Sequence, residues 1–104
     1  MRFIIFGLWS AFALAAPVAS HSADAQAEKV RAGAEIYQRN CSPCHGPRMQ
    51  DPEGAFDLRT FPADQRERFV NSIVRGKNQM PPWGDLIKPD EIDALWAYVL
   101  SERQ

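Results

Sequence analysis

Two cysteines three positions apart, with a histidine directly after the second, most constrain what this chain of 104 residues can form. They are Cys41, Cys44 and His45, and the chain has no other cysteine. A disulfide between the two would close a very small loop and would restrain little of the unfolded chain. So short a domain usually needs stabilisation beyond its small core, and that stabilisation must therefore come from something other than a disulfide.

Four kinds of site use such a motif. A tetrahedral zinc site needs a fourth ligand, and the only other histidine, His21, lies in or beside an apolar N-terminal segment. A thioredoxin-like dithiol needs a preceding strand, whereas the residues before Cys41 indicate a helix that is ending. A structural disulfide leaves His45 without a role. Covalent attachment of haem uses all three side chains, because the thiols form thioethers and the histidine binds iron.

The first 25 residues have the composition of an export signal. A basic second residue precedes an apolar run over residues 3–16, which Pro17 ends. Small residues then offer signal-peptidase sites near residues 20 and 25. A retained anchor is the alternative, but a membrane span needs about 20 predominantly apolar residues and this segment has too many polar ones. The sequence predicts a cleaved signal peptide over 1–25, a periplasmic domain over 26–104, and no membrane association after cleavage.

Apolar residues at helical spacing predict three helices, over residues 27–40, 62–75 and 89–101. Pro89 and the acidic residues after it mark the start of the last helix, and Gly76 is a natural stop for the middle one. The remainder is expected to be loop, rich in proline and glycine. An all-α domain with so much loop needs an apolar group at its centre against which the helices and loops pack. Haem has the size and the apolar character to fill that place.

The segment GAEIYQRNCSPCH resembles the N-terminal helix and haem-attachment motif of class I c-type cytochromes. Gly33 and Tyr37 match the positions at which that helix crosses the C-terminal helix, and Leu95 and Tyr98 match the partner positions. The resemblance implies an all-α, cytochrome c-like fold. Three main helices and loops would wrap around one covalently bound haem c.

The segment NQMPPWGDL resembles the distal loop of that family, in which a methionine sulfur binds the sixth position of the iron. Met80 is far enough along the chain from His45 to reach the other face of the porphyrin, and Pro81 and Pro82 stiffen the loop. A core methionine that fills a gap is the alternative. Met49 is too close to His45 for this role and is expected to be a surface or rim residue.

Two further residues resemble haem contacts of the family. Trp83 matches an aromatic residue that packs on the haem edge, although a plain core tryptophan is the alternative. Arg59 is placed like a basic residue that binds a haem propionate, and a solvated surface charge is its alternative.

The axial histidine of this family donates its Nδ1–H to the carbonyl of a proline, and the matching position here is Phe56. An acceptor is still expected, because such partners orient the ring and tune the iron. The Phe56, Pro47 and Pro52 carbonyls are all candidates.

These residues predict a monomeric periplasmic carrier of single electrons. With His45 and Met80 both on iron no position is open for substrate, so an enzyme is not expected. Near balance of 12 basic and 13 acidic residues argues against a nucleic-acid partner. Residues 56–99 resemble cytochromes that accept electrons from periplasmic quinoprotein alcohol dehydrogenases, so such an enzyme and a downstream oxidase or cytochrome are the expected partners. A haem-based gas sensor and a permanent haem subunit of a larger oxidoreductase are the alternatives.

Overall fold

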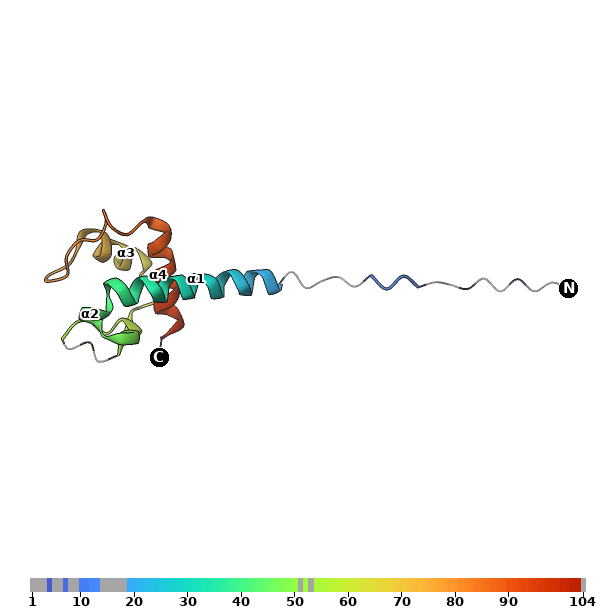
Figure 1. Ribbon diagram of the computed structural model, residues 1–104, viewed down its shortest axis with the longest axis horizontal. Coiled ribbons are helices and arrows are strands. Elements are labelled where there is room, and N and C mark those ends of the chain that lie inside the picture. Colours follow the sequence, from blue (N-terminus) through green and yellow to red (C-terminus); the bar gives the residue numbers. More distant parts are fainter. Residues whose placement is uncertain are drawn as a thin grey trace.

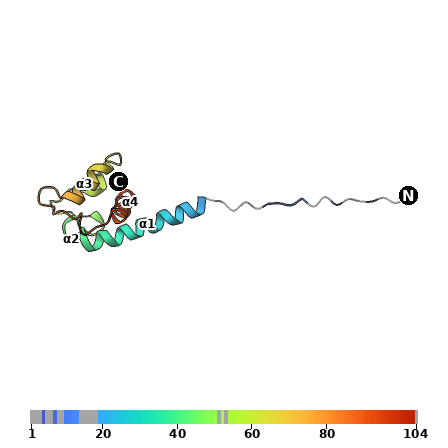
Figure 2. The same cartoon turned by 90° about the horizontal axis from the view of Figure 1, so that it is seen from above.

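The computed structural model describes residues 4, 7, 10–13, 19–50, 52 and 54–103. Its elements in chain order are helices and short 3-10 turns, with no strand in the part of the chain that is described: α1 (Ala19–Asn40), α2 (Ser42–His45), η1 (Pro47–Met49), η2 (Leu58–Thr60), α3 (Arg66–Arg75) and α4 (Pro89–Ser101). The N-terminal part of α1 projects from the body that the other elements form (Figures 1 and 2). The all-α prediction is therefore confirmed.

Helix boundaries agree with the sequence in part. α4 covers the predicted residues, and α1 ends at Asn40 as predicted but begins at Ala19, before the predicted start at residue 27. α3 begins at Arg66 rather than residue 62, because the Gln65 N–H donates to the Pro62 carbonyl at 3.1 Å and closes a turn there. Most of the predicted signal peptide lies outside the described residues, and its cleavage stays a prediction.

The crossing of α1 over α4 organises the fold (Figure 1). A Cβ atom at Gly33 would overlap the backbone of Ala94 and would lie 2.9 Å from the Cβ of Tyr98. Beside this contact, the rings of Tyr37 and Tyr98 stand 5.4 Å apart, centre to centre. The predicted roles of Gly33, Tyr37 and Tyr98 are confirmed. The backbone that Gly33 meets is that of Ala94, whereas Leu95 is buried in the core.

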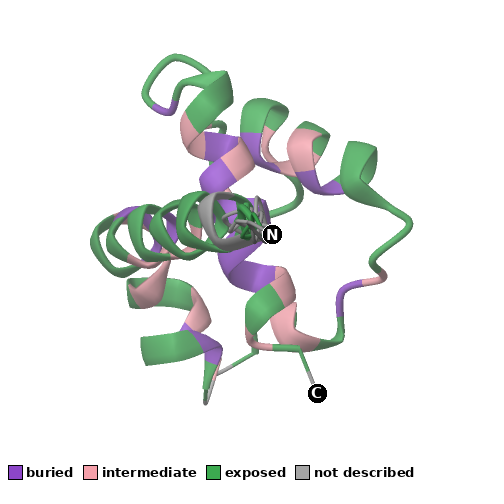
Figure 3. Ribbon diagram, turned by 90° about the vertical axis from the view of Figure 1, so that its right-hand side faces the viewer, coloured by how far each residue is buried: buried purple, intermediate pink, exposed green. Residues whose placement is uncertain are grey.

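The core lies where α1, α3 and α4 face one another, while residues 22–29 of α1 are exposed (Figure 3). Met49 belongs to this core and is 0% exposed. The prediction that Met49 is a surface or rim residue is therefore wrong. The reason is a reversal of the chain at Arg48 and Met49, whose φ angles of 54° and 61° are left-handed and turn the methionine inward.

Candidate functional site

The predicted attachment motif forms one turn of helix directly after α1. Cys41 caps α2, and its carbonyl accepts a hydrogen bond from the His45 N–H at 2.9 Å. Residues three and four positions apart share a face of a helix, so Cys44 and His45 lie on the side of the turn that Cys41 begins. The sequence analysis expected loop at this place, and the structure instead gives the motif a defined helical geometry.

Both thiols are free. Cys41 packs against the hydrophobic core and Cys44 is exposed. Burial, with a smaller contribution from nearby Cys44, raises the pKa of the Cys41 thiol to about 11. A dithiol redox motif depends on a lowered thiol pKa, so this environment does not favour that interpretation. Within the described residues, no group of three or more metal-binding histidine, cysteine or acidic side chains converges, so the zinc interpretation gains no support either.

The ring of His45 has a defined partner. Its Nδ1 atom lies 3.1 Å from the carbonyl oxygen of Phe56. A carbonyl oxygen only accepts hydrogen bonds, so Nδ1 carries the proton and the lone pair of Nε2 is left for a metal. Of the three acceptors that the sequence left open, the structure selects Phe56, the position that matches the family's proline.

Tyr37 holds the chain just beyond His45. Its hydroxyl is buried and donates to the Gly46 carbonyl at 2.6 Å, and burial is the main cause that raises the pKa of Tyr37 above its ordinary value. The sequence analysis gave Tyr37 only a role in the helix crossing. The sequence could have predicted this second role, because a tyrosine in a helix crossing is buried and a buried tyrosine hydroxyl usually has a hydrogen-bond partner.

Met80 lies on a tight turn after α3. Lys77 and Met80 exchange backbone hydrogen bonds of 3.1 and 2.9 Å, and a Cβ at Gly76 would lie 2.6 Å from the Met80 carbonyl oxygen. Gly76 therefore does more than end a helix, because it also lets the loop fold back on itself. Met80 is half-buried against the core. The Trp83 N–H then donates to the Ile73 carbonyl at 2.7 Å and ties the loop to α3.

The two segments that carry the predicted iron ligands lie at the same end of the molecule. α2 and the loop after α3 both lie at the end away from the N-terminal projection of α1, in the two views of Figures 1 and 2. His45 is carried by α2 and Met80 by that loop.

The two weaker site predictions have different surroundings. Arg59 forms a two-point ion pair with Asp57, with N–O distances of 3.1 and 3.2 Å. Its side chain is only 20% exposed, so it is not a freely solvated charge. Trp83 is half-buried and packs against the core cluster. Both residues stay candidate haem contacts.

Comparison with known proteins places the chain in a family. Residues 28–99 match the family model described as cytochrome c oxidase, cbb3-type, subunit III. The chain belongs to the class I c-type cytochromes. The cytochrome c6 of Anabaena variabilis is 32% identical to it over 77 residues, which are 69% of this chain and 90% of the relative. The cytochrome c6 of a Nostoc strain is 31% identical over 75 residues, 67% of this chain and 68% of the relative.

Larger proteins also contain a similar segment. The quinohemoprotein alcohol dehydrogenase ADH IIB of Pseudomonas putida is 35% identical over 79 residues, which are 71% of this cytochrome but 11% of the dehydrogenase. No solved structure matches the chain. These findings identify the cytochrome as a haem-based electron carrier of the c type.

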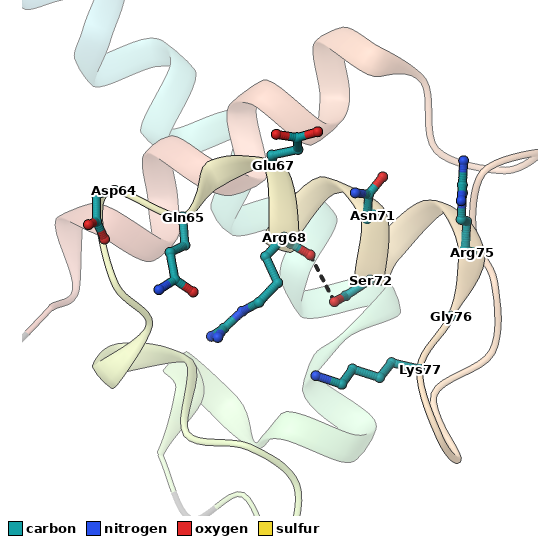
Figure 4. A pocket seen from close by; sticks show the side chains of 9 residues that line it. All are labelled: Asp64, Gln65, Glu67, Arg68, Asn71, Ser72, Arg75, Gly76 and Lys77. Atoms are coloured by element: carbon teal, nitrogen blue, oxygen red, sulfur yellow. Dashed lines mark hydrogen bonds between the residues drawn. The ribbon is translucent and has the colours of Figure 1, made fainter.

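An open pocket of about 610 Å³, lined by polar and charged residues, lies along α3 (Figure 4). The side chains of Gln65, Arg68 and Lys77 point to the same side of that helix. None of the predicted haem or iron contacts of the cytochrome lines it. The residues that do are Asp64, Gln65, Glu67, Arg68, Asn71, Ser72, Arg75, Gly76 and Lys77.

None of the described helices has the length and apolar character needed to cross a membrane.

Proposed function

We propose that this cytochrome carries one electron at a time on a single haem c and is not itself an enzyme. Cys41 and Cys44 would hold the porphyrin through two thioethers, and His45 and Met80 would supply the protein ligands of the iron. One observation carries the proposal: the Phe56 carbonyl occupies Nδ1 of His45, beside two free thiols on the same helical turn. That arrangement leaves Nε2 as the ligand, so the residues present fit the group.

The protein residues also account for the chemistry. Haem supplies, when bound, a metal that changes its charge by one electron. Met80 is a soft, neutral ligand, and it stabilises the reduced form and raises the reduction potential. The Nδ1 hydrogen bond of His45 acts in the opposite direction, because it makes the imidazole a stronger donor. With His45 and Met80 as its ligands, the iron would leave no position open for a substrate.

The first test is attachment. The haem of the wild-type protein is expected to stay on the polypeptide through acid–solvent extraction, because thioethers are covalent. The double variant Cys41→Ser/Cys44→Ser should release it and should be largely unfolded, since the core filler is lost. Release of haem from the wild type by simple extraction would refute the proposal.

The second test is ligation. Met80→Ala should retain the haem but should bind carbon monoxide or imidazole readily, and its reduction potential should fall as water or hydroxide replaces sulfur. Met49→Leu is the matched control, because it conserves volume at a buried methionine that is not proposed to bind iron. A Met80→Ala protein with a wild-type visible spectrum would require another ligand.

Electrons are proposed to leave through an apolar rim. Pro43 and Pro47 beside the motif, and Pro81 and Pro82 after Met80, are all exposed. Such a surface suits brief docking over about 1,200 Å² or less. A net charge of −1 gives little long-range steering, so transfer rates should depend weakly on ionic strength. Stopped-flow transfer across a salt series, with Pro82→Glu as the variant, tests this surface.

The proposed setting is the periplasm, reached through cleavage of the signal peptide over 1–25. The proposed donor is a quinoprotein alcohol dehydrogenase and the proposed acceptor a membrane oxidase or another cytochrome. The similarity of the chain to a segment of ADH IIB supports the donor, and the family description supports the acceptor.

A second function follows from the same family description, which names a subunit of an oxidase. The cytochrome would then be a permanent part of a larger oxidoreductase rather than a monomeric carrier. Gel filtration of the protein from its native source separates the two, because a carrier elutes at the size of one chain. A gas sensor is the third possibility. In that case the wild-type protein would bind carbon monoxide, because the gas would displace Met80.

A further inference from the structure

The carbonyl that accepts the His45 Nδ1–H belongs to Phe56, which lacks the pyrrolidine ring by which a proline fixes its φ angle. Gly54 lies two positions before it with a φ of 95°, in a conformation that glycine adopts easily. A hydrogen bond of 3.1 Å to a half-buried histidine nevertheless depends on where this carbonyl points. Besides the backbone hydrogen bond from Ala55 to Pro52, the contacts of the Phe56 side chain bear on that direction.

The side chain of Phe56 supplies that contact. Its ring meets the ring of Phe61 edge-on, with centroids 5.9 Å apart and an angle of 80° between the planes. Phe56 is 52% exposed, whereas Phe61 is 6% exposed and belongs to the core cluster. The exposed ring is therefore anchored on a buried one, in the geometry that aromatic pairs prefer.

Phe61 is itself held from two helices. Its ring stands edge-on to Phe69 of α3 at 5.6 Å and to Trp96 of α4 at 5.8 Å. The guanidinium carbon of Arg68 lies 4.5 Å from the centre of the same ring, which is a favourable cation–π distance. Movement of Phe61 would disturb all of these contacts, so it is a firm support for Phe56.

The following residue fixes the other end of the same peptide unit. The Asp57 carboxylate accepts the Arg59 N–H at 3.0 Å, and the Asp57 carbonyl accepts the hydroxyl and the N–H of Thr60 at 2.8 and 3.1 Å. These bonds close η2 directly after Phe56. The Phe56 carbonyl thus lies between a capped turn and a ring pinned to the core.

We propose that Phe61 is a positioning residue for the axial histidine: through the ring of Phe56 it holds the carbonyl that orients His45 and strengthens it as a donor. The proposal rests on the proposed function, in which His45 binds iron. Without the support of Phe61 the Phe56 carbonyl moves more freely, and the hydrogen bond from Nδ1 weakens. A weaker bond makes His45 a poorer donor and shifts the reduction potential upward.

The test uses the haem-loaded protein and the variant Phe61→Leu. Two quantities are measured: the rate at which the His45 Nδ1 proton exchanges with solvent in the reduced protein, followed by NMR, and the reduction potential. Exchange should become faster by a factor of up to about ten, the equilibrium equivalent of one edge-to-face contact. The potential should become more positive. A merely structural role of Phe61 would move neither quantity in the folded protein.

Phe69→Leu is the matched control. It removes another ring that packs on Phe61 and Trp96, but Phe61 still supports Phe56. This control should lose stability and keep the exchange rate and the potential of the wild type. An equal change of both quantities in Phe69→Leu would overturn the proposal, because general loosening of the core would then explain them.

A second variant covers the case in which Phe61→Leu does not fold. Phe56→Ala leaves the accepting carbonyl in place and removes only the half-exposed ring, so it should reproduce faster exchange and a higher potential. Phe56→Tyr keeps the ring and should restore the wild-type values. Unchanged exchange rate and potential in Phe56→Ala would overturn this inference alone. If the visible spectrum of the wild-type protein showed that no histidine binds the iron, the proposed function itself would be overturned.

Discussion

The α1–α4 crossing and the motif end of the molecule are stabilised in different ways. At the crossing, Gly33 brings one helix onto the backbone of the other, and Tyr37 and Tyr98 close the angle. At the motif end, short helical turns are closed by a few hydrogen bonds, Cys44 is exposed and His45 is half-buried. The crossing is thus packed entirely by side chains and backbone of the protein, whereas the motif end has less buried side chains, among them Cys44 and His45.

The comparison indicates that the crossing provides stability and that the motif end carries the proposed iron ligands. Tyr37 joins them, because its ring packs in the crossing while its hydroxyl holds Gly46, next to His45. Met49 also connects the two regions, because its backbone follows the motif in η1 while its side chain packs in the core. Substitutions at these places can show how far the two regions depend on each other.

The largest effect is expected at Met49, which is 0% exposed. Met49→Ala should lower the free energy of unfolding by about 2–5 kcal/mol, because it leaves a cavity in the core. The visible spectrum of the folded protein should not change, in contrast to Met80→Ala. Denaturant unfolding and the spectrum together check this, and Met49→Leu should cost less than about 1.5 kcal/mol. A spectral change in Met49→Ala would show that the core and the iron ligands are not separable.

Gly33→Val tests the crossing directly. The new side chain must push α1 away from the Ala94 backbone, and overpacking of this kind costs roughly 1–3 kcal/mol, occasionally more. A lowered melting temperature with a near-normal haem spectrum is expected, since the crossing lies away from the motif. Ala32→Val, on the exposed side of α1, is the control and should change stability little. Equal melting temperatures for Gly33→Val and the wild type would contradict the close approach.

Tyr37→Phe separates the two roles of one residue. The ring pair with Tyr98 stays, but the Gly46 carbonyl loses its buried donor, which should cost about 1 kcal/mol. Hydrogen exchange should become faster in α2 and stay unchanged where α1 and α4 cross. Faster exchange in both places would mean that the hydroxyl supports the crossing as well.

The smallest effect is expected from pH. The hydrogen bond from Arg59, the main cause, holds the pKa of the Asp57 carboxyl below its ordinary value. A lowered pKa in the folded state stabilises the protein above the ordinary value near 4, and this stabilisation is lost as pH falls through the folded pKa. Asp57→Asn should remove this part of the acid sensitivity in unfolding curves between about pH 2 and 6. Identical pH profiles would show that the pair contributes nothing measurable, as many exposed pairs do.

The sequence by itself determined the features that depend on local spacing and residue chemistry. The spacing of Cys41, Cys44 and His45 defines the predicted attachment motif, and helical periodicity gives the all-α class and the bounds of α4. The crossing at Gly33, Tyr37 and Tyr98 is predicted from the resemblance to class I c-type cytochromes. The motif and the helix periodicity lie within a few helical turns of chain, so no long-range information is needed to find them.

Only the tertiary structure decided where the loops go. It buried Met49 through two left-handed residues, and it chose Phe56 rather than Pro47 or Pro52 as the partner of His45. It also paired Arg59 with Asp57 and placed Phe61 among rings from α3 and α4. The Arg59–Asp57 pair is local, but the burial of Met49 and the packing of Phe61 depend on contacts with α3 and α4, which lie far away in sequence.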